Sequence, residues 1–234
     1  MLVQDEGFVI KSVKYGDRST INTVFSKKNG LITLIHSRSS SKKSKKVNFF
    51  QALSWLEFLY YNSNKKTIYR IKEVNFKDSN QAITQNVTTT SLCFFIAEVL
   101  QQIIKEEEEN KMLYGFIQNQ FQKLQLKETV KQNFHLQFLV DILPYLGIAP
   151  NLKSGKGYFD LLEGCSSNEL PAHNNYIEGE KQSLFQSLLQ KEDFPDKKER
   201  KLALKLLFTY VDLQLNSRLL KLKSVPVLEA VFLD

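Results

Sequence analysis

The residues best suited to chemistry form one short basic segment, numbered 37–46. It reads Ser-Arg-Ser-Ser-Ser-Lys-Lys-Ser-Lys-Lys and contains no acidic residue. Arginine and lysine neutralise phosphates and release counterions without base-specific geometry, so the segment favours contact with a nucleic acid backbone. A solvated loop that only raises solubility is the alternative interpretation. The predicted phosphate contacts are Arg38, Lys42, Lys43, Lys45 and Lys46.

A second basic and aromatic set lies at strand ends and turns within the first 28 residues. Small barrels bind single strands by stacking bases on exposed rings while lysines follow the backbone. Tyr15, in a turn, is the best stacking candidate. The set comprises Lys11, Lys14, Tyr15, Arg18, Lys27 and Lys28. A structural role is expected for six further aromatic residues, Phe49, Phe50, Trp55, Phe58, Tyr60 and Tyr61.

The positive charge of the chain is concentrated in its first third. Residues 1–80 carry 15 Lys and Arg against 6 Asp and Glu, whereas residues 81–234 carry 17 against 19. Such asymmetry predicts an anionic partner for the first third. Nucleic acid is the commonest such partner, and an acidic membrane surface is the second.

Residue patterns typical of catalysis or of metal binding are absent from the sequence. The three histidines, His36, His135 and His173, are isolated, and the consecutive carboxylates Glu106 to Glu109 point around a helix instead of converging. Gly-Lys-Gly at 155–157 is too short for a phosphate-binding fingerprint. We therefore expect no enzyme, no cofactor and no metal. A hydrolase or nuclease would need a convergent cluster of carboxylates, His or Cys.

The cysteines and the N-terminus indicate the cellular setting. Cys93 and Cys165 cannot form a disulfide framework or a four-thiolate zinc site, and Cys93 lies in an apolar run where burial is expected. The chain opens without a basic and apolar leader, and no stretch approaches 18 apolar residues. We expect a soluble protein of the cytoplasm and the nucleoid, with no membrane partner.

The first 80 residues have the pattern of a small β-barrel. Five β-rich runs, within 8–13, 20–25, 31–36, 52–61 and 67–76, are separated by turn residues. Asn29-Gly30 is a strong hairpin signal because both residues tolerate the positive φ of a type I′ turn. Five strands predict an OB-type barrel, and an SH3-like barrel fits the strand count nearly as well.

Beyond a polar stretch at 78–90 the apolar period changes from 2 to 3.6 residues, which predicts helices. A helix near 130–146 is apolar nearly all round and should lie at the centre, with a kink at Pro144 and an end at Gly147. Ser224 is expected to cap the last helix. The fold class is therefore α+β, with a nucleic-acid-binding barrel (1–80) and a helical domain (81–234) that contains an irregular insertion (148–179).

Several segments resemble the RecO family of bacterial recombination mediators. Glu-Gly-Phe-Val-Ile-Lys at 6–11, Tyr-Gly-Asp-Arg-Ser at 15–19 and the run 25–33 resemble its first strands and their turns. Residues 146–152 and 158–164 resemble the exit of its central helix and the hairpin beyond. Many members carry four cysteines there as a zinc site, whereas here Cys165 remains with His173 nearby. Two ligands cannot close a tetrahedral site, so we expect none.

The resemblance implies a non-enzymatic protein that binds single- and double-stranded DNA through the barrel and anneals complementary strands without ATP. It also implies help in loading the recombinase onto DNA covered by single-strand-binding protein. The implied partners are RecR and the acidic, Phe-ended tail of single-strand-binding protein, held by the helical domain, where the Lys-rich helix 197–205 is a candidate. The alternative is an RNA-binding or ribosome-associated module, which relative affinity for RNA would reveal.

Overall fold

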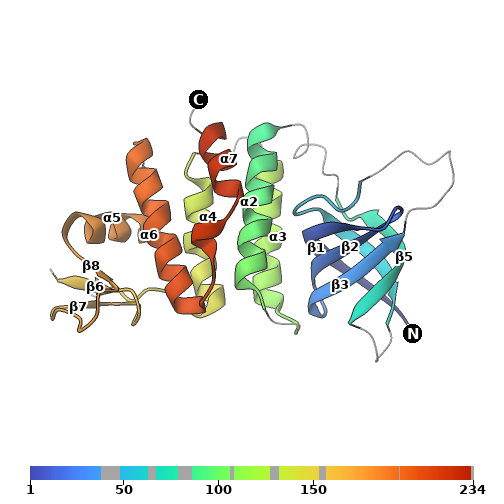
Figure 1. Ribbon diagram of the computed structural model, residues 1–234, viewed down its shortest axis with the longest axis horizontal. Coiled ribbons are helices and arrows are strands. Elements are labelled where there is room, and N and C mark those ends of the chain that lie inside the picture. The colour runs from blue at the N-terminus through green and yellow to red at the C-terminus, as the bar shows by residue number, and fades with distance from the viewer. Residues whose placement is uncertain are drawn as a thin grey trace. The chain divides into compact units, whose positions relative to one another are not determined.

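The computed structural model describes residues 1–37, 48–62, 67–78, 86–105, 108–126, 132–152, 157–194 and 196–232. The chain forms two compact units, Met1–Thr129 and Val130–Asp234 (Figure 1). Each is described by itself below. Of the basic segment 37–46, only Ser37 belongs to the described residues.

The first unit contains a closed β-barrel. Its strands are β1 (Leu2–Tyr15), β2 (Ser19–Ser26), β3 (Gly30–Ser37), β4 (Trp55–Tyr61) and β5 (Ile68–Phe76). Their order around the barrel is β1-β2-β3-β5-β4, and β3 runs parallel to β5 while the other pairs are antiparallel. This order confirms the predicted OB-type barrel over the SH3-like alternative.

The long first strand closes the barrel by pairing on both sides. Its first half pairs with β4 and its second half with β2, and the register shifts at Ile10. A bulge of this kind bends a strand and increases its twist. Alternate residues such as Val24, Leu34 and Leu56 are fully buried and fill the interior.

The turn between β2 and β3 differs from the expected two-residue type I′ turn. β2 ends at Ser26 and β3 begins at Gly30, so three residues form the connection. Only Gly30 has positive φ, at 63°, and Asn29 does not. The single left-handed residue is therefore Gly30, the first residue of β3, where glycine has no Cβ to clash.

Two helices complete the first unit, α2 (Val87–Ile103) and α3 (Lys111–Gln125). An asparagine caps the start of each helix. The side chain of Asn86 accepts a hydrogen bond from the backbone N–H of Thr89, and that of Asn110 accepts one from the backbone N–H of Leu113. On the barrel side, the ring of Phe8 packs against Phe121 of α3 at 5.6 Å. The first compact unit thus extends beyond the last barrel strand and includes α2 and α3. The division into folding domains 1–80 and 81–234 stays a prediction.

The second unit is built on helices. They are α4 (Phe134–Ile142), α5 (Gly179–Leu189), α6 (Lys197–Leu215) and α7 (Ser224–Val231), with 3-10 turns at Leu143–Leu146 and Leu219–Lys221. The expected central helix is α4, most of whose side chains are buried, but the α-helix ends at Ile142. The 3-10 turn Leu143–Leu146, which contains Pro144, continues it and stops at Gly147 with φ 73°. Ser224 is the first helical residue, not the cap, and Lys223 occupies the cap position without a side-chain hydrogen bond.

The insertion 148–179 contains a small sheet in the order β7-β6-β8, formed by β6 (Tyr158–Asp160), β7 (Cys165–Ser167) and β8 (Tyr176–Ile177). The fully buried ring of Phe159 joins this sheet to the helices, at 5.1 Å from Phe185 and 6.1 Å from Tyr210. Within the described residues, the helices are too short or too polar to cross a membrane.

Candidate nucleic-acid interface

The β1–β2 hairpin carries the first group of predicted contacts on an exposed arm. Every residue from 11 to 18 is exposed, and 58% of the Tyr15 surface is accessible. Buried Asn22 anchors the arm, because it accepts a hydrogen bond from Ser12 Oγ (2.7 Å) and donates one to the carbonyl of Leu34 (3.3 Å). Tyr15 therefore projects from a strand pair that is fixed to β3.

Side chains alternate along each strand, so those next to buried Asn22 and Leu34 point away from the interior. The strand register aligns these outward-facing side chains on one outer face of the barrel. Val13 lies across from Ile21, and Ile21 lies across from Ile35. The parallel pairing of β3 and β5 continues this face to Ile68 and Arg70, and Tyr61 lies across from Arg70. We call this surface the outer face. It comprises Lys11, Val13, Tyr15, Ser19, Ile21, Thr23, Thr33, Ile35, Ser37, Tyr61, Ile68 and Arg70.

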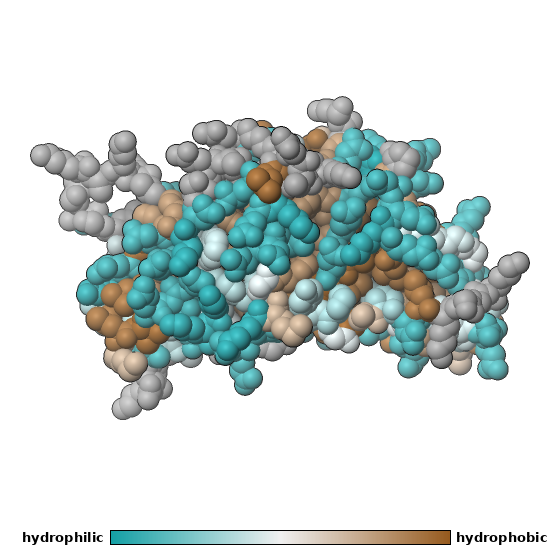
Figure 2. Space-filling view, turned by 180° about the vertical axis from the view of Figure 1, so that it is seen from behind, coloured by the Kyte–Doolittle hydropathy of each residue, from teal (hydrophilic) through white to brown (hydrophobic). Residues whose placement is uncertain are grey.

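The outer face combines exposed rings, aliphatic side chains and cations, and none of its members is acidic. Tyr61 is 48% exposed and Val13 is 49% exposed. The barrel, at the left in Figure 2, shows hydrophobic surface among the hydrophilic residues. In OB barrels the face of the second and third strands and the flanking loops bind oligonucleotides, with rings stacking on bases. Sequence reasoning missed Tyr61 and Arg70, which only the strand register brings to this face.

The described residues on either side of the basic segment lie against β2 and β3. Ser37, at the end of β3, has its hydroxyl 3.0 Å from that of Ser19. Beyond the segment, the ring of Phe50 packs at 5.1 Å against His36. Arg38, Lys42, Lys43, Lys45 and Lys46 themselves lie outside the described residues, so their contact with phosphate stays a prediction.

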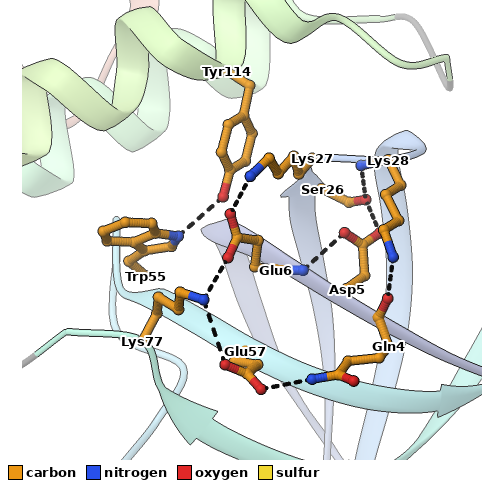
Figure 3. Close-up of polar contacts among 10 residues, drawn as sticks. All are labelled: Gln4, Asp5, Glu6, Ser26, Lys27, Lys28, Trp55, Glu57, Lys77 and Tyr114. Carbon is orange, nitrogen blue, oxygen red and sulfur yellow. Dashed lines mark hydrogen bonds and ion pairs between the residues drawn. The ribbon is translucent and has the colours of Figure 1, made fainter.

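Lys27 and Lys28 lie at the other end of β2 from the hairpin tip, roughly 24 Å away for eight extended residues. Lys27 Nζ is 2.9 Å from Glu6 Oε1, and Lys28 Nζ donates to the carbonyl of Gln4 at 2.8 Å (Figure 3). By contrast, Lys11, Lys14 and Arg18 have no ion-pair partner among the residues that the structure describes. The structure therefore does not bring the predicted second set together as one patch.

Glu6 holds Lys27 from one side and Lys77 from the other, at 2.9 Å each (Figure 3). Burial raises the pKa of Glu6, but hydrogen bonds and charge attraction from the two lysines outweigh it and leave the pKa below its ordinary value. The ionised carboxylate therefore offsets the charge of Lys27 and Lys77 near α3. DNA contacts by Lys27 and Lys28 stay a prediction.

The residues at the position of the family's zinc site do not fit a zinc ion. His173 Nε2 is 3.1 Å from Asp160 Oδ2, and His173 Nδ1 accepts a hydrogen bond from the backbone of Asn175. Asp160 Oδ1 accepts two backbone hydrogen bonds of its own. In the described ranges, no three His, Cys, Asp or Glu residues gather in a way that could hold a metal ion. Cys165 and His173 thus fall short of four tetrahedral ligands.

The second unit carries a pocket of about 210 Å³ lined by residues of α4, α6, α7 and the position after α7. Its lining combines aliphatic and aromatic groups with a basic rim, and comprises His135, Lys197, Arg200, Lys201, Leu204, Leu228, Glu229 and Phe232. His135 stacks on Phe232 with ring centroids 5.7 Å apart. Burial, helped by the charge of Arg200, lowers the pKa of His135 to about 4, so its ring is neutral at pH 7.

Comparison with known proteins shows similarity to one protein family over nearly the whole chain. The family model for the N-terminal part of recombination protein O matches residues 1–80, and the model for its C-terminal part matches residues 84–223. The DNA repair protein RecO of Flavobacterium psychrophilum is 31% identical, with 99% of this chain and 100% of the relative covered. The protein of the same name from Phocaeicola vulgatus is 29% identical over 81% of this chain and 80% of the relative.

A third relative matches over nearly the whole length of both chains. The DNA repair protein RecO of Azobacteroides pseudotrichonymphae is 27% identical, again with 99% of this chain and 100% of the relative covered. The boundary between the two family models, at 80–84, lies between the end of β5 at Phe76 and the start of α2 at Val87. On this evidence, the chain belongs to the RecO family of DNA repair proteins.

Proposed function

We propose that the chain acts as a recombination mediator by binding single-stranded DNA across the outer face and the basic segment 37–46. The observation that carries the proposal is the acid-free outer face, on which Tyr15 and Tyr61 flank aliphatic side chains beside Lys11 and Arg70. Bases stack on such rings in a sequence-tolerant way, while cations follow the phosphates. Ser37, the first residue of the basic segment, belongs to this face, with its hydroxyl 3.0 Å from that of Ser19.

Annealing follows from charge neutralisation alone. Two complementary strands repel each other through their phosphates, and a basic surface that neutralises both lowers this barrier as counterions are released. The proposed reaction needs no covalent step, and therefore no ATP and no catalytic residue. Double-stranded DNA would bind through the same phosphates, without base stacking. An annealing assay with two labelled complementary oligonucleotides, in the absence of ATP, tests this step. An annealing rate that is the same with and without the protein would contradict it.

Replacing Tyr15 by alanine is expected to weaken binding of single-stranded DNA by about 5- to 150-fold, because one stacked base contributes about 1–3 kcal/mol. Tyr15→Phe keeps the ring and is expected to bind like the wild type, which makes it the matched control. Fluorescence anisotropy of a labelled oligonucleotide measures both variants. Equal affinities for the alanine and phenylalanine variants would remove Tyr15 from the interface.

An RNA-binding function is the alternative, because a stacking face tolerates either nucleic acid. Discrimination depends on contacts to the 2′-hydroxyl. Competition between DNA and RNA strands of equal length and sequence separates the two functions. Displacement of bound DNA by RNA at a much lower concentration would favour the RNA-binding module.

We also propose that the pocket of the second unit receives the acidic, Phe-ended tail of single-strand-binding protein. Leu204 and Leu228 offer apolar surface for a terminal phenylalanine ring, and Lys197 and Arg200 lie beside it for carboxylates. Arg200 is held in place by donating to the carbonyl of Phe194 at 2.8 Å. RecR is proposed as a further partner on the family resemblance alone, and co-elution of the two proteins on size exclusion tests it.

Lys197→Glu together with Leu204→Ala is expected to weaken binding of an acidic peptide ending in phenylalanine by at least about tenfold. The substitutions remove one cation and part of the apolar pocket, together worth more than about 1.4 kcal/mol. Isothermal titration with the peptide measures the loss, and Lys181→Glu, an exposed site outside the pocket, is the control. The same affinity for a peptide without the phenylalanine would contradict this assignment.

A further inference from the structure

A polar cavity of about 280 Å³ lies beside the outer face of the barrel. It forms where β3 and β5 separate, because their pairing covers only Thr33–Ile35 against Ile68–Arg70. Thr33 belongs to the cavity lining and to the outer face at once. Exposed Tyr61 of the outer face stands between two lining residues, Tyr60 and Asn62. A strand that lies on the outer face therefore passes the mouth of the cavity.

The lining of the cavity is polar but carries no charged side chain among the described residues. Phosphate is bound by cations or by clustered backbone N–H groups, so the lining does not suit it. The ring of Tyr69, which packs at 5.3 Å against the buried ring of Tyr60, contributes aromatic surface. Hydroxyls of Thr33 and Thr67 and the amide of Asn62 add hydrogen-bonding groups. Such a combination suits a flat, neutral ligand with a polar edge.

A hydrogen-bond chain behind the cavity orients two of its polar groups. Asn29 Nδ2 donates to Asp5 Oδ2 at 3.0 Å and to the Tyr60 hydroxyl at 3.2 Å. The carboxylate thus fixes which way the Asn29 amide points and leaves its oxygen as an acceptor. Tyr60 accepts through its oxygen and keeps its own proton to donate. Burial, with the charge of Asp5 and then Tyr69 adding to it, raises the pKa of Tyr60 to about 12, so this proton is retained at pH 7.

We propose that this cavity receives one unstacked nucleobase of a single DNA strand lying on the outer face. The inference rests on the proposed function and adds to it a means of preferring single strands over duplex. A base inside a duplex is stacked and paired, and taking it out costs a few kcal/mol. A single strand offers its bases without that cost. The cavity is slightly smaller than the range of about 300–1,000 Å³ for drug-sized ligands, in keeping with a ligand of one base.

The test compares a thymidine oligonucleotide of about 20 residues with an abasic strand of the same length, by fluorescence anisotropy. The variant Asn62→Leu/Thr67→Val/Tyr69→Phe keeps the cavity's shape and removes three polar groups, none of which makes a side-chain hydrogen bond to another described residue. We expect its preference for the base-containing strand to fall at least about fivefold, as for lost hydrogen bonds worth about 1 kcal/mol. Its affinity for the abasic strand should stay unchanged.

Asn75→Leu, an exposed site on β5 outside the cavity, is the matched control and should keep the full preference. If thermal unfolding shows that the triple variant is not folded, Asn62→Leu alone replaces it. A folded cavity variant with the wild-type preference would overturn the base site while leaving the proposed function intact. A wild-type protein that binds neither strand at low salt would overturn both.

Discussion

Replacing Lys42, Lys43, Lys45 and Lys46 by glutamate is expected to lower the affinity for single-stranded DNA by about 100-fold or more at low salt. Each phosphate contact on a single strand contributes about 0.7 to the slope of log affinity against log salt. Loss of four contacts should therefore flatten the slope by about 3. The new carboxylates add repulsion to the loss of attraction. Anisotropy titrations of a labelled oligonucleotide at several salt concentrations measure affinity and slope together.

A control must change charge equally without touching the barrel. Lys181, Lys198, Lys205 and Lys221 are exposed lysines of the second unit, and replacing all four by glutamate gives the same change in net charge. This variant should keep most of the affinity and nearly the wild-type slope. If both variants lose the same affinity, net charge alone would explain binding, and the basic segment would be only a solubilising loop.

Phe121→Ala is expected to destabilise the first unit by about 3–5 kcal/mol, as for a buried phenylalanine truncated to alanine. The Phe121 side chain on α3 is fully buried, and its ring lies 5.6 Å from Phe8 and 6.0 Å from Trp55 of the barrel. Since Trp55 is the only tryptophan in the chain, its fluorescence reports on the barrel during denaturant unfolding. A mutation in the helix should therefore shift the unfolding midpoint of the barrel.

The matched control is Phe94→Ala on α2, whose side chain is 57% exposed, and its effect should stay below about 1 kcal/mol. The comparison also tests whether residues 1–80 fold as a separate domain. An unchanged Trp55 midpoint in Phe121→Ala would mean that the barrel folds independently of α3. It would then support the boundary that the change of sequence pattern predicts.

The strands of the barrel could be predicted because apolar residues alternate with polar ones between clear turn signals. The parallel pairing of β3 with β5 could not, because it joins segments separated by the basic segment and by β4. That pairing brings Arg70 to the outer face. The sequence predicts a structural role for both Tyr60 and Tyr61, yet Tyr60 is buried and Tyr61 is half exposed. Tyr60 and Tyr61 are neighbours in β4, and successive side chains of a strand point to opposite faces, so one ring enters the interior and the other reaches the surface.

Charge counting alone could not separate cations with internal partners from those without. Lys27 follows Lys11 and Lys14 in the same basic stretch, but it pairs with Glu6, which is distant in sequence. The carboxylate reaches Lys27 only because β1 pairs with β2. Similarly, the sequence places His173 near Cys165 at the position of the family's zinc site, whereas its pairing with Asp160 depends on the small sheet. Long-range pairing therefore decides which predicted residues are available to a ligand.

Single-stranded DNA is proposed to lie on the barrel, across the outer face and the basic segment. Ultraviolet cross-linking of a thymidine oligonucleotide to the intact protein, followed by peptide mass spectrometry, tests it most directly. We predict cross-links at Tyr15, Tyr61 or residues 37–46, and their loss when Lys42, Lys43, Lys45 and Lys46 are replaced by glutamate. Cross-links confined to residues 130–234 would contradict the account and would place DNA on the helical unit instead.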